Sequence, residues 1–280
     1  MAIRATAQAQ TGLLIVAHGA GAEWNANVRR AAEQVRWREG PVAVAFLMGE
    51  EVEHAGWDAG VRRLVDSGAR EIVVVPLLVS SHSAHYRQVQ YYAGRLDSLP
   101  DMPEAHHHVA LVPPPVPARV TPALDDAPEL GQALVARWRE LDERDRRRPV
   151  VLVAHGPNDA AEAERWITNL TTAAAALGKS GLRQPVRVGH IKDDAPPPIR
   201  AAAVSEIRDT VLTLAARAAD SVVVLPVLIS AGTIDRNKLP RDLAELPIRY
   251  FPAPLAPLPM IARWIERTAQ RASQEGRGNR

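Results

Sequence analysis

The sequence predicts an α/β protein of two similar doubly wound domains, each with a four-stranded, mainly parallel sheet flanked by helices. The first reason is an internal repeat, because "LLIVAHGA" at 13–20 returns as "VVLVAHGP" at 150–157. A second pair follows in the same order, with "EIVVVPLLVSSHS" at 71–83 and "SVVVLPVLISAGT" at 221–233. The second reason is the alternation of aliphatic runs with helical patterns, which is typical of βαβ units with right-handed crossovers.

The aliphatic runs are continuous and β-branched, as expected for parallel strands that helices cover on both faces. In the first half we expect strands at 13–17, 42–47, 71–79 and 107–112, and helices at 22–38, 56–67, 84–97 and 124–145. In the second half we expect strands at 150–154, 186–191, 221–229 and 248–252, and helices at 159–177, 198–218, 237–245 and 257–273. The arginine-rich "DERDRRRP" is the expected boundary, which gives domains over 1–147 and 148–280.

The composition narrows the class of protein. Of the 280 residues, 46% are hydrophobic and 24% are charged, which is typical of a globular chain. A formal net charge of +2 gives no basis for a nucleic-acid partner. There is no cysteine, so a bound metal must use imidazole or oxygen ligands. No stretch resembles a signal peptide or a membrane span, and we therefore expect a cytoplasmic protein without a membrane partner.

Histidines and serines follow the first and third expected strands. His18 stands at the end of the first strand. Those after the third strand are Ser80, Ser81, His82, Ser83 and His85. Each has an ordinary explanation, because serines cap helices and single histidines are common in loops. Ligands of open α/β sheets nevertheless bind beyond the carboxyl ends of the strands, so two histidine motifs at neighbouring strand ends predict a site near His18.

These stretches also resemble a known family. "LLIVAHGAGAEWNANV" and "VVVPLLVSSHSAHY" are similar to the class II chelatases, the sirohydrochlorin cobaltochelatase (CbiX-type) group related to ferrochelatase. Those proteins carry a His-Gly motif at a strand end and a second histidine after a later strand, and larger members contain two such halves. The resemblance implies a chelatase-like fold and the insertion of a divalent metal, Co²⁺ first with Ni²⁺ or Fe²⁺ as alternatives, into sirohydrochlorin or a related tetrapyrrole. The metal would be a substrate, and no organic cofactor is implied.

The resemblance also implies roles for particular residues. His18 would be the metal ligand and proton acceptor. The position of the second histidine falls between His82 and His85, so both are candidates for catalysis and metal binding. The family's acidic residue after the second strand has no counterpart unless Glu50 or Glu51 takes that role.

Sirohydrochlorin carries carboxylates, which suit arginine, lysine and backbone N–H groups at helix starts. The candidate substrate-binding residues are Ser80, Ser81, Ser83, Arg87, Arg236 and Lys238. An ordinary surface role stays open for each of the three basic residues.

The second half resembles a degenerate copy that shapes the cleft. It keeps His155 but has Gly232 at the position of His82. A site made of His155, His190 and Asp193 is an alternative, although helix capping explains the aspartate better. The run "AHHHVALV" at 105–112 could bind a metal through His106 and His108, but a solvated strand entrance is the preferred interpretation.

Three rival functions stay open at this point. The protein could be an iron or nickel chelatase, or an enzyme of the same fold that acts on another small molecule. It could instead be a non-catalytic carrier of metal or tetrapyrrole. Because tandem domains can replace a symmetric dimer, we expect a monomer, with a homodimer as the alternative.

Overall fold

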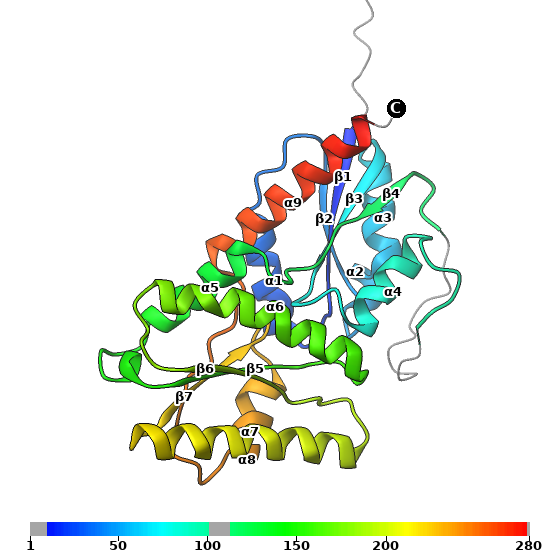
Figure 1. The fold of residues 1–280 in the computed structure, drawn as a ribbon. Helices are drawn as coiled ribbons and strands as arrows, with labels where there is room; N and C mark the ends of the chain where they lie inside the picture. The colour runs from blue at the N-terminus through cyan, green and yellow to red at the C-terminus, as the bar shows by residue number, and fades with distance from the viewer. Residues whose placement is uncertain (1–9, 101–112, 279–280) are drawn as a thin grey trace, which may run out of the picture.

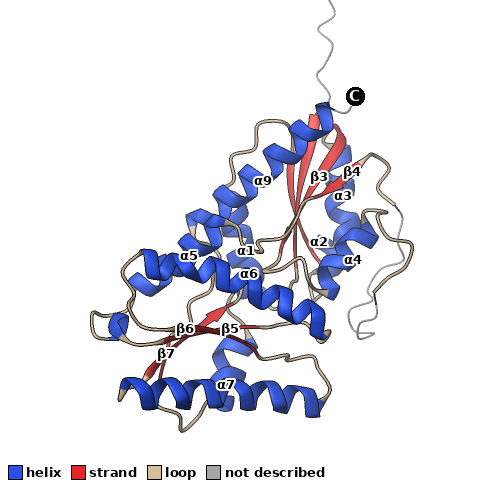
Figure 2. Cartoon of the chain, in the orientation of Figure 1, coloured by secondary structure: helices blue, strands red, loops and turns tan. Residues whose placement is uncertain are grey.

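The computed structural model describes residues 10–100 and 113–278, and it contains two parallel four-stranded sheets (Figures 1 and 2). The first sheet has the strand order β2-β1-β3-β4. Its strands are β1 (Gln10–Ala17), β2 (Val42–Phe46), β3 (Ala69–Leu77) and β4 (Ala118–Val120). The order reverses between β1 and β3, so the carboxyl ends of these two strands form the switch point where ligands bind in this class of sheet.

The second sheet repeats the first, with the order β6-β5-β7-β8. Its strands are β5 (Val150–Ala154), β6 (Val186–His190), β7 (Val222–Val227) and β8 (Ile248–Tyr250). All pairings in both sheets are parallel. The predicted fold class is therefore confirmed, including its internal repeat.

Helices cover the sheets and connect their strands. In the first half they are α1 (Ala22–Glu33), α2 (Val52–Ala55), α3 (Trp57–Asp66), α4 (Ala84–Tyr92) and α5 (Pro128–Arg139). In the second half they are α6 (Ala160–Lys179), α7 (Pro197–Ala218), a π-helical turn (Ile234–Lys238), α8 (Leu239–Asp242) and α9 (Pro259–Gly278). A short 3₁₀ turn (Asp145–Arg147) precedes β5.

The fourth strand of the first sheet differs from the expectation. The predicted strand at 107–112 lies outside the described residues. The strand that pairs with β3 is β4, in which Ala118 lies opposite Ile72. It has three residues and directly follows the proline-rich segment 113–117, so it carries too little pattern to be found from the sequence.

The last helix of each half packs on the other half. Helix α9 contacts α1, β1 and β3 of the first sheet, and α5 contacts α6 (Figure 1). Trp264 and Ile265 of α9 are buried in a core that also contains Ile15 and Leu152, one from each sheet. Each such side chain contributes roughly 1.5–3 kcal/mol of burial free energy. The two sheets therefore share one core. The expected domain boundary between residues 147 and 148 marks where the sequence repeat begins again, and as a boundary between structural domains it stays a prediction.

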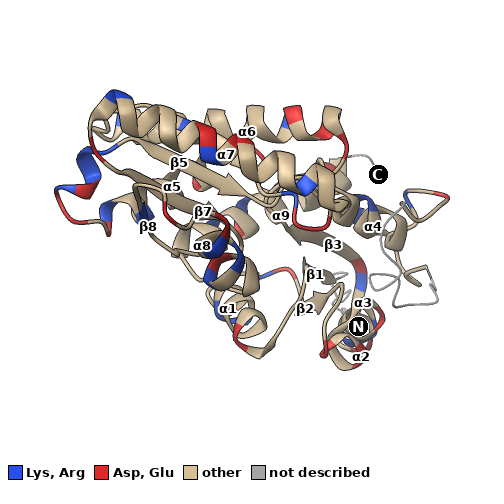
Figure 3. Ribbon diagram, turned by 90° about the horizontal axis from the view of Figure 1, so that it is seen from below, with Lys and Arg blue, Asp and Glu red and all other residues tan. Residues whose placement is uncertain are grey.

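No helix in the described ranges is long and apolar enough to cross a membrane. Lysines and arginines are interspersed with acidic residues along the same elements in Figure 3, and no single basic face is visible in that view.

Candidate functional site

A cavity of about 890 Å³ lies where the two halves meet, and its size suits a small-molecule ligand. It is lined by the loops that follow β1, β2 and β3 in the first half and β5, β6 and β7 in the second. The switch points of both sheets therefore open into one shared cavity. Its aromatic and apolar lining includes Trp24, Met48, Leu78, Trp166, Leu228 and Ile229.

His18 enters this cavity directly after β1. The next residue, Gly19, has φ +87°, and an added Cβ there would overlap the carbonyl oxygen of Met48. Glycine is thus needed for the turn that places the histidine. The His18 Nδ1 lies 2.7 Å from the Gly19 carbonyl oxygen. Because a carbonyl oxygen accepts only, Nδ1 donates, and Nε2 is the nitrogen with a lone pair for a metal.

His85 enters from the first turn of α4, whose N-terminus is capped by the Ser83 hydroxyl, 3.2 Å from the Tyr86 N–H. The His85 Nδ1 lies 3.1 Å from Oε1 of Gln88, and the Gln88 amide donates to the Tyr92 hydroxyl at 3.0 Å. Gln88 and Tyr92 are buried. This buried chain fixes the orientation of the imidazole, as outer partners do for histidines that bind a metal through Nε2.

The rings of His18 and His85 lie edge to face, with their centroids 4.5 Å apart. The structure thus brings these two predicted residues together. His82 is half-buried and is not among the described residues that line the cavity. Its backbone N–H donates to the Ser80 hydroxyl at 3.0 Å.

The three serines have different positions. Ser80 and Ser83 line the cavity, and Ser80 is buried. Ser81 faces the loop before α5, where its hydroxyl donates to Asp125 at 2.6 Å and its backbone N–H donates to the same carboxylate at 2.7 Å. Within the described residues Ser81 therefore holds the loop rather than lining the cavity.

The basic candidates are all paired with carboxylates. Arg87 lines the cavity and pairs with Glu162 of α6. Lys238 also lines it, with its Nζ 2.5 Å from the Asp193 carboxylate. Arg236 is exposed, pairs with Glu23 and is not one of the described lining residues.

The expected acidic residue after the second strand does not reach the cavity. The Glu51 carboxylate accepts a hydrogen bond from Asn25 at 2.9 Å and pairs with Arg29. The hydrogen bond from Arg29, followed by that from Asn25, lowers the pKa of Glu51. Neither Glu50 nor Glu51 is among the described lining residues. The carboxylates in the cavity come from the second half, and they belong to Asp159, Glu162, Asp193 and Asp194.

His155 repeats the geometry of His18. Its Nδ1 lies 3.0 Å from the Gly156 carbonyl oxygen, and its Nε2 lies 3.0 Å from Oδ1 of Asp194. Burial acts to lower the pKa of His155, but the hydrogen bond and charge of Asp194 outweigh it, so the pKa is raised.

Asp194 shows that the second half faces the two histidines of the first. Burial acts to raise its pKa, but the hydrogen bond and charge of His155 lower it to about 2. The charges of His85 and His18 contribute in the same direction. The carboxylate therefore lies within electrostatic reach of both walls of the cavity.

His190 has a structural place instead of joining this group. It is buried against Gly156 and Trp166, with its ring centroid 5.4 Å from that of Trp166. Burial, followed by the charges of Lys192 and His155, lowers its pKa to about 4, so the ring is neutral at pH 7. The described ligand atoms that lie within 4.8 Å of one another belong to His155, Asp193 and Asp194. His106, His107 and His108 lie outside the described residues.

The sequence reasoning missed the walls of the cavity. Trp24 and Trp166 occupy inward positions of α1 and α6, and Trp24 lies with its ring centroid 6.2 Å from that of His18. Gly232 packs against Trp24, since an added Cβ would lie 3.3 Å from its ring. A side chain at residue 232 would therefore crowd the ring of Trp24.

Known proteins share this architecture. SirB from Bacillus subtilis, solved with Fe³⁺, is 17% identical over 96% of this chain and 98% of that chain, with a TM-score of 0.64. SirB from Bacillus subtilis subspecies spizizenii, a sirohydrochlorin chelatase solved with cobalt, is 16% identical over 96% and 97%, with a TM-score of 0.60. CbiX, described as the terminal enzyme of siroheme biosynthesis in denitrifying bacteria, is 18% identical over 93% and 99%, with a TM-score of 0.51. At these identities the likeness establishes the fold.

Comparison with curated proteins gives no significant match. The CbiX family profile, in contrast, matches both halves of the sequence, over residues 12–141 and 149–272. The predicted family is therefore confirmed, and this chain belongs to the CbiX family.

Proposed function

We propose that the protein is a metal chelatase that inserts a divalent ion, Co²⁺ foremost, into sirohydrochlorin or a closely related tetrapyrrole. The observation that carries this proposal is the meeting of His18 and His85, 4.5 Å apart between ring centroids, inside the shared cavity. Both rings have Nδ1 within hydrogen-bond distance of an oxygen acceptor, which is the arrangement of histidines that bind a metal through Nε2. Membership of the CbiX family supports the same activity.

Imidazole also suits the two tasks of the reaction. It is a borderline ligand that holds Co²⁺, Ni²⁺ or Fe²⁺ without the permanence of a thiolate. When the ion passes from His18 to the macrocycle, the released imidazole regains a lone pair that can accept a proton. Two pyrrole N–H protons leave for each ion that enters, and they pass to imidazole and then to water.

The cavity offers partners for both parts of the macrocycle. Trp24 and Trp166 provide apolar surface for its ring system. Arg87 and Lys238 provide positive charge for its carboxylates, in exchange for their present partners Glu162 and Asp193. Ser80 and Ser83 add hydroxyl groups next to His85, whereas we assign Ser81, His82 and Arg236 supporting positions outside the cavity.

Fe²⁺ is the first alternative to Co²⁺. The SirB structures were solved with Fe³⁺ and with cobalt, and the CbiX structure is connected with siroheme, an iron product. Two imidazoles alone do not discriminate strongly between these ions. The choice of Co²⁺ therefore needs a direct ranking of metals.

The test is a visible absorption time course. Purified protein is mixed with sirohydrochlorin and Co²⁺, Ni²⁺ or Fe²⁺ in turn, beside a protein-free blank. A protein-dependent rise of the metallated spectrum, fastest with Co²⁺ and lost in His18→Ala, is the expected result. His54→Ala is the matched control, because His54 is an exposed histidine that is not a lining residue. No acceleration with any metal would contradict the proposal.

The same experiment separates an enzyme from a carrier. With sirohydrochlorin in large excess, an enzyme forms many product molecules per chain. A carrier binds metal or tetrapyrrole in a fixed ratio and yields no product spectrum. We further expect the protein to act in the cytoplasm as a monomer, and light scattering at several concentrations distinguishes this state from a homodimer.

A further inference from the structure

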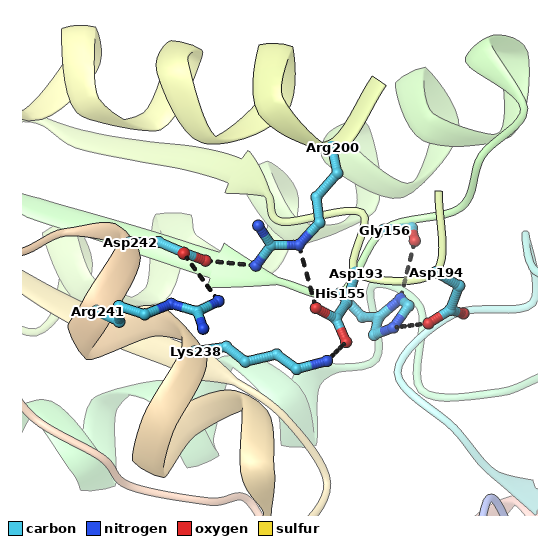
Figure 4. Close-up of polar contacts among 8 residues, drawn as sticks. All are labelled: His155, Gly156, Asp193, Asp194, Arg200, Lys238, Arg241 and Asp242. Carbon is cyan, nitrogen blue, oxygen red and sulfur yellow. Dashed lines mark hydrogen bonds and ion pairs between the residues drawn. The ribbon is translucent and has the colours of Figure 1, made fainter. Parts of the chain in front are cut away.

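The cavity that contains His18 and His85 is also lined by an imidazole and two carboxylates from the second half. Figure 4 shows the polar contacts of these three side chains. His155 follows β5, and Asp193 and Asp194 follow β6, its neighbour in the sheet. One ligand atom from each of the three lies within 4.8 Å of the others. This cluster resembles a metal site in two respects.

The first respect is the tautomer of His155. Its Nδ1 lies against a backbone carbonyl oxygen, that of Gly156, and so carries a hydrogen. Neutral His155 therefore turns a lone pair on Nε2 toward Oδ1 of Asp194, which is also an acceptor. Two acceptors 3.0 Å apart repel each other unless a cation joins them. That cation is either a proton on Nε2 or a metal ion.

The second respect is the distance. Nitrogen and oxygen ligands lie about 2.1 Å from a transition metal, so two ligands at a right angle are about 3.0 Å apart. The separation of Nε2 and Oδ1 is 3.0 Å. This spacing is that of an N–H···O hydrogen bond, and it also lets the two atoms bind one ion as neighbouring ligands without rearrangement.

The surroundings support these two ligands as a site. Asp193 is fixed by Lys238 at 2.5 Å and by Arg200 at 3.3 Å, as Figure 4 shows. Its charge is therefore balanced, and it acts as a neighbour that orients the loop rather than as the main ligand. The carbonyl of Gly156 orients the ring of His155 as outer partners do in metal sites.

We propose that His155 and Asp194 form a second binding site for a divalent transition metal, separate from the ion that His18 and His85 hold. The second half lacks a counterpart of His82, and Asp194 would then provide the second ligand beside His155. This inference goes beyond chelation, because its test needs neither tetrapyrrole nor turnover.

The test counts Co²⁺ ions bound per chain by equilibrium dialysis and by visible absorption of the bound ion. All variants are made in a background with residues 106–108 replaced by alanine, because three successive histidines can bind metal themselves. We expect about two ions per chain in this background. Either double variant, His155→Gln/Asp194→Asn or His18→Ala/His85→Ala, should retain about one ion, each with a different absorption spectrum.

The controls separate a lost site from a lost fold. His54→Gln/Asp66→Asn removes an exposed histidine and an exposed aspartate that do not line the cavity, and it should keep both ions. Far-UV circular dichroism and the urea midpoint establish that each variant folds.

Two results would overturn the proposal. The second ion could persist in His155→Gln/Asp194→Asn, which would place it elsewhere. Alternatively, the protein with residues 106–108 replaced by alanine could bind about one ion, and either double variant could abolish its binding. The four residues would then form a single metal site. Failure of chelation in the absorption assay would leave this count unchanged, so the two proposals fail independently.

Discussion

Gln88 controls the ring of His85, and its replacement by leucine tests whether that ring is a ligand. Oε1 of Gln88 accepts from Nδ1 of His85, while its amide group donates to the Tyr92 hydroxyl. Gln88 is fully buried, so water cannot replace either contact. Gln88→Leu has a similar shape but leaves His85 without the acceptor that fixes its tautomer.

The expected effect falls on metal affinity more than on stability. Loss of such an outer partner usually weakens metal binding about 10–100-fold, which corresponds to about 1.4–2.7 kcal/mol. The Tyr92 hydroxyl loses its donor, at a cost of about 1–3 kcal/mol, and the buried leucine offsets part of this cost. We therefore expect the free energy of unfolding to fall by no more than about 2 kcal/mol.

The assay is a Co²⁺ titration followed by visible absorption, with urea denaturation in parallel. Gln90→Leu on the same helix is the matched control, because Gln90 is half-buried and is not one of the described lining residues. Gln88→Glu should keep or strengthen binding, since a carboxylate partner makes imidazole a better ligand. Wild-type Co²⁺ affinity in a folded Gln88→Leu protein would show that Gln88 does not hold the His85 ring as a metal ligand.

Three further predictions concern single residues. Gly19→Ala should lower the free energy of unfolding, measured in urea, by at least about 2 kcal/mol. The reason is that the φ of +87° at Gly19 and the adjacent carbonyl of Met48 exclude a side chain. A loss below about 0.5 kcal/mol would contradict this prediction. His85→Ala should weaken Co²⁺ binding at least about tenfold by calorimetry and His82→Ala less than about twofold, and the reverse ranking would assign the ligand to His82. Burial acts to raise the pKa of Glu129, but the hydrogen bonds and charge of Arg267 lower it below 4.5. Above pH 4.5, the ion pair of Glu129 and Arg267 should therefore stabilise the protein by about 1 kcal/mol relative to Glu129→Gln. This difference should disappear as the pH falls below 4.5, because the carboxylate is then protonated. A pH-independent difference in urea midpoints between the two proteins would argue against the ion pair.

Much of the fold is visible in the sequence because the repeat constrains it. Two His-Gly motifs at the ends of aliphatic runs mark β1 and β5, and the same order of strands and helices then follows twice. The position of His18 at a switch point comes from this order alone. For the second histidine, the sequence leaves His82 and His85 as candidates. Helix α4 begins at Ala84, and its first turn places His85 next to His18.

The features that the sequence could not predict depend on how the halves face each other. Asp194 follows a different strand from His18 and is 176 positions away in the chain, yet the charges of His18 and His85 act on it. No local pattern connects such residues. The same is true of α9, which belongs to the second half of the repeat but packs on the first sheet. The short strand β4 was missed for a different reason, because three residues next to prolines carry little periodicity.

In the proposed function, His18 and His85 together receive the metal ion. The most direct measurement is a crystal structure of the protein with Co²⁺, with anomalous diffraction data recorded at the cobalt absorption edge. We predict an anomalous peak about 2.1 Å from Nε2 of both His18 and His85, and its absence in His18→Ala. An anomalous peak at other residues, with none between these two rings, would show that the two histidines do not receive the ion.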